Sequence, residues 1–537
     1  MIAVLLPLLQ KGCICWRAVV KMTAFIYSCS LSLHQKRKMG NIRKEMALLC
    51  EVRCHWDGMA AFRQERDRCK RYCYGDQWGD LIKVDGTWMR EEHYIRMHGS
   101  EPLKNNLIRR LVKQVLGLFR SEHDLPQPQC QRKREADCMV DILSDIDKLN
   151  CVDELNVRAL EEFLISGMVA QRKTFGWRQG YCDCWTDNVA LDYFFIDNAM
   201  SDCRGWDVGC VGEIHDLSFD KLCCEFAHSE SDVQWLQSIY GNGQYEDRVR
   251  QMLSDFGMDT GGPTDFFFPG KRHFCRVYEV WRKELHWGWL CHDRTQGRLF
   301  WSEELPPTDV SGKWTPKEEW HFYYLTPFGD VLAEGRTPYS HQGHPYVFKA
   351  YPFIDGEVHS FVSDIIDQQR YTNRLITLYD WVMRSSAKGV LLVPEESIPD
   401  GYTLSDVADE WSRFNGVIPV RTRNGESLPQ QVSANAVNVG INELLQTQLG
   451  FMEDISGVTG ALQGKASNAG VSGTLYEQQT HNSTLSQLDL LDSFRHFLTE
   501  GRRKDMSNVQ QFYSDERLAE RMPASHVMAF RQAKILI

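Results

Sequence analysis

The sequence predicts an α+β protein in which helices predominate, and three observations support this fold class. Apolar residues recur at spacings of three, four and seven through several long segments, which is the pattern of amphipathic helices. An aromatic and glycine-rich segment that follows Gly176 contains short runs typical of strands. A small unit of strands and a helix is inserted between two long helical segments, 361–383 and 434–457.

Length and composition place the chain among ordinary globular proteins. Its 537 residues are 43% apolar and 25% charged, enough for two to four domains or one large body with insertions. The net charge of −11 argues against a protein that binds nucleic acid over its whole surface. It does not exclude a protein past which DNA slides without being bound tightly. The 18 cysteines fall in irregular clusters, which favours reduced thiols in a cytosolic compartment.

Residues 1–45 are expected to be a non-native or disordered extension. The first nine residues are apolar, but no basic region precedes them as a signal peptide requires. The longest uncharged run there, 22–33, is shorter than the roughly 20 residues that span a bilayer. The sequence therefore predicts no membrane association.

The part of the chain from residue 46 to 355 is predicted to be helical first and β-rich later. Helical patterns cover 51–122, with a turn at 75–79, and one further helix is expected over 137–167. Strands are expected at 189–196, 273–282 and 320–325, the last of which continues through a turn at 326–330 into a hairpin. A helical interlude is expected over 217–256.

The next segment combines a long helix with a small αβ insertion. The helix at 361–383 carries Ile365, Leu375 and Tyr379 on one apolar stripe. Two strand-like pieces, 389–394 and 416–421, flank an acidic helix expected at 405–414.

A second long helix is followed by a glycine-rich loop. Ile441, Leu445 and Met452 form the helix's apolar stripe, so this helix is expected to pack against a neighbour. The segment 457–473 holds five glycines in seventeen residues and cannot continue a helix cheaply, because each interior glycine costs about 1 kcal/mol. A capping-box pattern at 474–477 then begins another amphipathic helix.

Four short stretches resemble the portal protein of tailed bacteriophages, the head-to-tail connector. They are residues 74–78 (YGDQW), 367–374 (DQQRYTNR), 388–394 (KGVLLVP) and 468–473 (NAGVSG). The order of the predicted elements is the stronger part of the resemblance. It implies a wing at 46–355, a first stem helix at 356–388, a clip at 389–431, a second stem helix at 432–457, a tunnel loop at 458–473, a further helix at 474–500, and the start of a crown, short enough to be truncated, at 501–537.

The resemblance implies a non-enzymatic ring of twelve subunits at one capsid vertex, without cofactor or metal. Double-stranded DNA would pass through it during packaging and ejection. The implied partners are the large terminase subunit, the head–tail adaptor, and the major capsid and scaffolding proteins, in the virion and, during assembly, in the host cytoplasm. The residues expected to face the DNA are Gly464, Lys465, Ser467, Asn468 and Gly470.

Lys465 is the only charged residue between Asp454 and Glu477, so a ring of such lysines would contact phosphates without reading sequence. The alternative for Lys465 is a solvated side chain without a partner.

Three other functions and one zinc site are alternatives to this interpretation. A phosphate-binding P-loop is absent, because Gly464-Lys465 has Thr459 in place of the first glycine and Ala466 after it. A metal-dependent nuclease would need convergent acids, and the alternative is that these acids are turn residues; the candidates are Asp187, Asp192, Asp197, Asp202 and Asp207. A zinc site can be drawn from Cys50, Cys54, Cys69 and Cys73, although cysteines are often simply buried. A structural tail or collar protein without a DNA channel is a third alternative.

Overall fold

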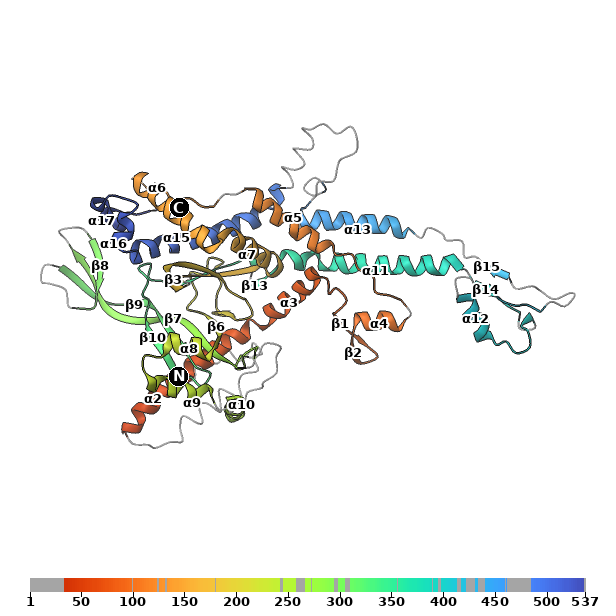
Figure 1. Ribbon diagram of the computed structural model, residues 1–537, viewed down its shortest axis with the longest axis horizontal. Coiled ribbons are helices and arrows are strands. Elements are labelled where there is room, and N and C mark those ends of the chain that lie inside the picture. The colour runs from red at the N-terminus through yellow and green to blue at the C-terminus, as the bar shows by residue number, and fades with distance from the viewer. Residues whose placement is uncertain are drawn as a thin grey trace, which may run out of the picture. The chain divides into compact units, whose positions relative to one another are not determined.

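The computed structural model divides into two compact units, which are described separately (Figure 1). Unit 1 comprises residues 1–66, 119–360 and 489–537, and unit 2 comprises 67–118 and 361–488. The structure describes residues 33–535 except 99, 123–124, 131–132, 179, 242–244, 257–265, 272, 294–297, 305–309, 355, 389, 395–396, 413–416, 422–429, 433–439, 459 and 461–483.

Unit 1 is a mixed body of antiparallel sheets and helices. Its helices are α2 (Leu33–Gly58), α6 (Lys133–Asn150), α7 (Val152–Ser166), α8 (Phe219–Phe226), α9 (Glu230–Tyr240), α10 (Tyr245–Phe256), α15 (Leu488–Phe512), α16 (Asp515–Ala519) and α17 (Ala524–Gln532), and α3 (Ala60–Tyr74) begins in it. Its strands are β3 (Met168–Arg178), β4 (Tyr181–Asn188), β5 (Phe194–Ile196), β6 (Cys210–Ser218), β7 (Phe274–Asp293), β8 (Arg298–Ser302), β9 (Val310–Leu325), β10 (Val331–Arg336), β11 (Tyr346–Ala350), β12 (Phe353–Ile354) and β13 (Glu357–Val358).

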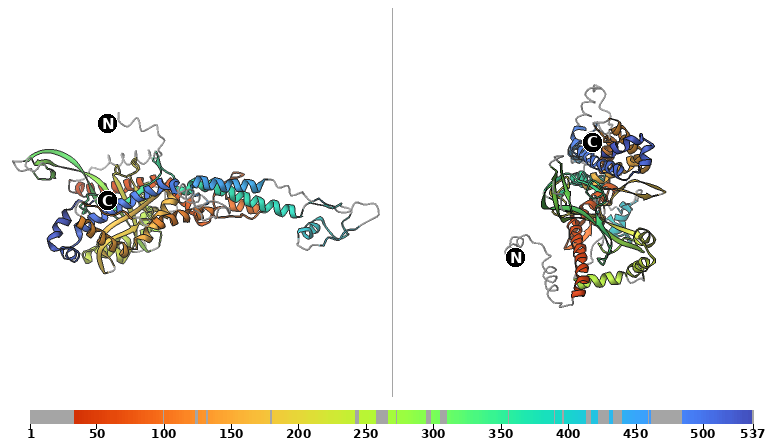
Figure 2. Two further views of the ribbon diagram at one scale, coloured as in Figure 1. Left: turned by 90° about the horizontal axis from the view of Figure 1, so that it is seen from above. Right: turned by 90° about the vertical axis from the view of Figure 1, so that its left-hand side faces the viewer.

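The largest sheet has the strand order β10-β9-β7-β6-β5, with β8 paired to the far end of β7. The first half of β7 pairs with β6, and the β7–β9 pair then extends beyond β5, β6 and β10, with β8 beside its far end (Figures 1 and 2). The predicted hairpin is confirmed: Thr326 donates its N–H to the carbonyl of Asp330 at 2.8 Å, and Gly329 supplies a φ of +85°. The strand expected at 189–196 is shorter than predicted, because residues 191–193 form a turn before β5.

Two helical predictions for unit 1 have different outcomes. The interlude at 217–256 is confirmed as α8, α9 and α10. The single helix expected at 137–167 is wrong, because Cys151 adopts a φ of +51° and separates α6 from α7. A left-handed residue cannot continue a right-handed helix, and the apolar periodicity on both sides concealed the break.

The core of unit 1 packs α2 against the large sheet. Leu49 and Val52 of α2 are buried in one cluster with Phe194, Phe195 and Tyr278 of the strands. Aromatic side chains carry large apolar areas, so this cluster supplies much of the unit's hydrophobic stabilisation. Helix α2 begins at Leu33, upstream of the boundary at 45/46 that the sequence suggested.

The boundary at 500/501 does not coincide with a structural break. Helix α15, expected to end near residue 500, continues to Phe512 because apolar periodicity resumes with Met506 and Val509, which are buried against α6. Lys173 of β3 and Asp505 of α15 form a buried ion pair at 2.8 Å. Residues 501–535 therefore pack within unit 1.

Unit 2 contains two long helices, a support segment formed by residues 67–118, and a small insertion between the helices. Its elements are β1 (Leu81–Val84), β2 (Thr87–Arg90), α4 (Glu91–Met97), α5 (Leu107–Glu122), α11 (Phe361–Lys388), β14 (Val390–Leu392), α12 (Leu404–Ser412), β15 (Gln430–Val432) and α13 (Ile441–Ser456). The helices at 361–383 and 405–414 are confirmed as α11 and α12. The β1–β2 hairpin lies in a segment that the sequence predicted to be helical.

One strand prediction for the insertion is wrong. The partner of β14 is β15, whereas residues 417–421 form no strand. Arg421 instead donates its N–H to the carbonyl of Ser397 at 2.9 Å and forms an ion pair with Asp400 at 2.5 Å. None of the helices in the described part of the chain is long and apolar enough to cross a membrane.

Candidate functional site

The candidate site is the pair of long helices in unit 2. Helices α11 and α13 lie side by side and run antiparallel, with the β14–α12–β15 insertion at the end where α11 stops and α13 starts (Figures 1 and 2). On α13, Ile441 and Met452 are buried and Leu445 is half-buried. These residues are spaced four and seven apart, so they share one face of the helix.

The predicted stripe on α11 divides into two parts. Ile365 and Leu375 are buried within the chain. Tyr379 is 46% exposed, so it packs little within one chain, and its role in stem packing stays a prediction about an assembly. Leu378 and Trp381 beside it are similarly exposed, at 46% and 53%.

A second apolar stripe runs along the uncovered face of α13. Leu444, Phe451 and Ile455 are 39%, 46% and 48% exposed. Their spacings of seven and four place them on one face, distinct from the buried face. The helix pair therefore presents aromatic and aliphatic side chains to solvent from both α11 and α13, and clustered exposure of this kind is typical of surfaces that contact another protein.

A buried polar network fixes α11 to the support segment. Asn373, fully buried, donates to the Gln77 side-chain oxygen at 2.7 Å and accepts from the Asn105 N–H at 3.2 Å and from Gln369 at 2.9 Å. Gln77 and Asn373 belong to two of the sequence stretches that resemble portal proteins, 296 residues apart. These two stretches are thus in direct contact in the fold.

Gln369 also caps the start of α5. Its side-chain oxygen accepts the N–H groups of Leu107 at 3.0 Å and Ile108 at 3.3 Å, and Asn106 accepts the Arg109 N–H at 3.1 Å. The first N–H groups of a helix have no partner inside the helix, so caps satisfy them. One side chain of α11 therefore sets the position of α5.

Charged groups extend this network to the β1–β2 hairpin. Glu91, nearly buried at the start of α4, pairs with Arg370 at 3.2 Å and with Arg374. Asp80 accepts hydrogen bonds from Arg71 at 3.0 Å and Tyr72 at 2.9 Å. Burial alone would raise the pKa of Asp80, but these hydrogen bonds lower it below its usual value, so the carboxylate stays charged.

The base of the glycine-rich loop is closed by hydrogen bonds at the end of α13. Ser486 donates to the Gly457 carbonyl at 2.9 Å, and the buried Gln487 donates to the Ser456 carbonyl at 2.6 Å. The chain thus leaves α13 and returns to the same point. The predicted DNA-facing residues Gly464, Lys465, Ser467, Asn468 and Gly470 lie outside the described residues.

We predict that Gly457→Ala loosens this base. Gly457 has a φ of +64°, and an added Cβ would lie 2.5 Å from the Ser486 hydroxyl oxygen. The left-handed conformation alone costs about 1–2 kcal/mol for a residue with a side chain. Hydrogen exchange at residues 484–488 should accelerate. Gly450→Ala is the control, because its Cβ would meet nothing within 4 Å and alanine favours a helix; equal exchange in both variants would contradict the prediction.

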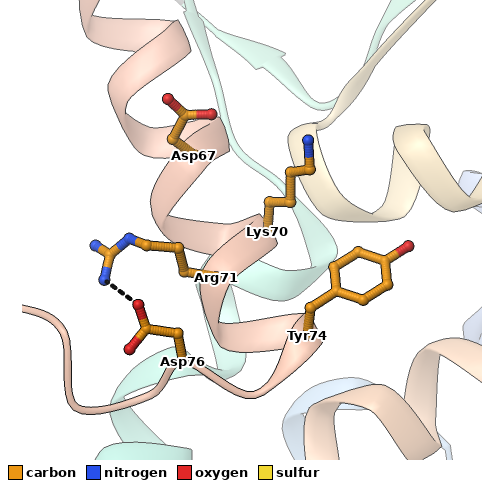
Figure 3. Close-up of a pocket in the computed structure, with 5 residues that line it drawn as sticks. All are labelled: Asp67, Lys70, Arg71, Tyr74 and Asp76. Atoms are coloured by element: carbon orange, nitrogen blue, oxygen red, sulfur yellow. Dashed lines mark ion pairs between the residues drawn. The ribbon is translucent and has the colours of Figure 1, made fainter. Parts of the chain in front are cut away.

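A surface hollow in unit 2 is lined by Asp67, Lys70, Arg71, Tyr74 and Asp76 (Figure 3). Arg71 faces Asp76 at 4.0 Å and also binds Asp80, while Lys70 points away from that pair. The hollow thus contains two carboxylates and two cations, so its formal charges balance.

The aspartates considered for a nuclease each have a local structural role. Asp187 pairs with Arg178 at 2.7 Å, Asp192 with Arg66 at 2.8 Å and Asp202 with Arg204 at 2.9 Å; Asp197 accepts the Ala199 N–H at 3.0 Å and Asp207 the Ser201 N–H at 2.7 Å. Two groups of three potential metal ligands occur among the described residues, and neither contains one of these aspartates or a cysteine. The structure gives no support to the nuclease or the four-cysteine zinc site.

The chain therefore contains a two-helix hairpin with an exposed apolar face, which is the kind of surface that contacts other protein chains. The chain belongs to the phage P22-like portal protein family, whose model matches residues 49–520. A search of the curated proteins found no match. The resemblance read from the sequence is thereby confirmed: this is a phage portal protein that serves genome packaging as the head–tail connector, at the capsid vertex of the virion.

Proposed function

We propose that copies of this chain form a closed ring, of twelve subunits, through which double-stranded DNA is packaged and later ejected. In this assignment unit 1 provides most of the wing, α11 and α13 form the stem, residues 389–431 form the clip and residues 458–473 form the tunnel loop. The large terminase subunit and the head–tail adaptor would dock on the ring in turn, and capsid and scaffolding proteins would contact it during assembly in the host cytoplasm. The ring itself would have no enzymatic activity.

The observation that carries this proposal is the uncovered apolar stripe on the stem. Leu444, Phe451 and Ile455 repeat on one helix face and remain exposed in the single chain. Burying a side chain of this size contributes about 1.5–3 kcal/mol. A head-to-tail ring repeats the same contact at every interface, so a modest stripe becomes a strong assembly signal.

The charge distribution supports a conduit that does not hold DNA tightly. Helix α13 carries Glu443, Glu453 and Asp454 and no lysine or arginine. Acidic side chains repel phosphates, so DNA would not adhere to this surface. Lys465, repeated around the ring, would supply transient and sequence-independent contacts.

A packaging reaction tests the conduit. The double variant Gly470→Pro/Gly473→Pro fixes φ and removes two backbone donors, so it should form rings but protect less DNA from nuclease than the unaltered protein. Lys465→Ala should package with altered salt sensitivity. Gly450→Ala serves as the control substitution. Normal protected DNA in the double variant would show that loop mobility is not needed for packaging.

A further inference from the structure

Two histidines and a glutamate meet on one face of the long β7–β9 strand pair of unit 1. Glu284 and His286 lie on β7 and His321 lies on β9. In the register of the pair, Arg282 is opposite His321 and Glu284 is opposite Glu319. Because alternate residues of a strand share a face and paired residues point the same way, all three side chains emerge on the same side.

The two imidazoles are in direct contact. Their Nε2 atoms lie 2.8 Å apart, and the rings stack with centroids 4.8 Å apart and an interplanar angle of 11°. The ligand atoms of His286, His321 and Glu284 all lie within 4.8 Å of one another. The Glu284 carboxylate is oriented by a hydrogen bond, because the hydroxyl of the buried Tyr323 donates to it at 2.7 Å.

The other acid–histidine group in the described residues differs in one decisive respect. In the group of Glu213, His215 and Glu279, the Arg172 guanidinium lies 3.2 Å from Glu279 and 3.6 Å from Glu213. Burial alone would raise the pKa of Glu279, but the hydrogen bond from His215 and the charge of Arg172 lower it to about 2. In that group the positive charge of Arg172 already lies where a metal ion would be. Among the described residues, Glu284 is paired with no lysine or arginine.

We propose that Glu284, His286 and His321 bind a divalent transition-metal ion, with Zn²⁺ the best chemical match. Two imidazole nitrogens and one carboxylate oxygen are a ligand set that zinc uses, with bonds of about 2.0–2.2 Å and a fourth position for water. Tetrahedral ligands at these bond lengths are about 3.3 Å apart, so the two Nε2 atoms need to separate only slightly. Tyr323 acts as the outer partner that orients the carboxylate.

Charged side chains next to the proposed metal site determine which contacts must change when the ion binds. Arg336 approaches His286 Nδ1 at 3.4 Å and is ion-paired with Glu303, while Glu319 pairs with Lys317 at 3.2 Å. When Nε2 of His286 binds the metal, Nδ1 must carry the proton, so the long contact from Arg336 is lost and its pair with Glu303 stays. The ion would then join β7 to β9 at the base of their extension, which carries the exposed Trp287.

Zinc titration of the purified full-length protein tests this proposal. Isothermal calorimetry with Zn²⁺ should show one high-affinity site per chain, and Co²⁺ in its place should give the strong visible absorption of tetrahedral coordination. His286→Ala and His321→Ala should each lower the affinity at least tenfold. Tyr323→Phe, which leaves all three ligands in place, should lower it about 10- to 100-fold.

His292→Ala is the matched control, because His292 is an exposed histidine on the same strand, and it should bind Zn²⁺ as the unaltered protein does. Glu284→Gln keeps the side-chain shape and should weaken binding, which separates loss of a ligand from loss of folding. Equal affinity in the unaltered protein and the His286→Ala/His321→Ala double variant would overturn the proposal, and so would an unaltered protein without a zinc site. Either result would mean that His286 and His321 are hydrogen-bonded to each other but do not bind a metal ion.

Discussion

Replacing Phe451 and Ile455 together by serine should leave the chain folded but prevent ring formation. Both side chains are about half exposed in the single chain, so their loss removes little internal packing. If the exposed half of each side chain is buried between subunits, the two together contribute about 1.5–3 kcal/mol per interface. At 1.4 kcal/mol per tenfold change, each interface would weaken by about 10- to 100-fold, and the loss is repeated at every interface of the ring. Mass photometry should therefore find monomers where the unaltered protein gives rings.

Met452→Ala separates this effect from damage to the helix pair. Met452 is 2% exposed, one residue from Phe451 but on the buried face of α13. Truncating a buried methionine costs about 2–5 kcal/mol of folding stability. Circular dichroism should show lower stability for Met452→Ala and nearly unchanged stability for the serine double variant. Intact rings in the serine variant would show that this stripe is not the interface.

Replacing Asn373 by leucine should destabilise the packing of α11 against the support segment by about 2–6 kcal/mol. Leucine fills a similar volume but leaves the side-chain oxygen of the buried Gln77 and one side-chain N–H of the buried Gln369 without their hydrogen bonds. Each such group costs about 1–3 kcal/mol. Hydrogen exchange at residues 105–108, where Gln369 and Asn373 accept backbone N–H groups, should accelerate most.

Asn442→Leu is the control for this experiment, because Asn442 is exposed on α13. It should change exchange at residues 105–108 very little. If Asn373→Leu exchanges there as slowly as the unaltered protein, the network does not fix the start of α5. Faster exchange confined to α11 would show that the network stabilises its own helix only.

The fold was predictable where a local pattern decides the structure. Helix α11 followed from apolar spacing, and the hairpin between β9 and β10 followed from its turn residues. Partners far apart in sequence were not predictable, so β15, the partner of β14, was not expected as a strand, whereas residues 416–421 were. Strand pairing depends on tertiary register, which a short apolar run does not encode.

The two long helices of the candidate site could be predicted from the sequence. The buried polar network that joins α11 to the support segment could not. Polar residues of an amphipathic helix usually face solvent, yet Gln369 and Asn373 are both fully buried. The available signal was that polar residues at 369, 372 and 373 interrupt the apolar face of α11. His286 and His321 are 35 positions apart, so only the pairing of two long strands brings them together.

An image of the purified protein tests the central claim most directly. Negative-stain or cryo-electron microscopy of the unaltered protein, with the Phe451→Ser/Ile455→Ser variant beside it, would show the assembly state of both. We expect closed rings with a bore wide enough for duplex DNA in the unaltered protein and single subunits in the variant. Solid discs, open filaments, or a closed ring without such a bore would contradict it.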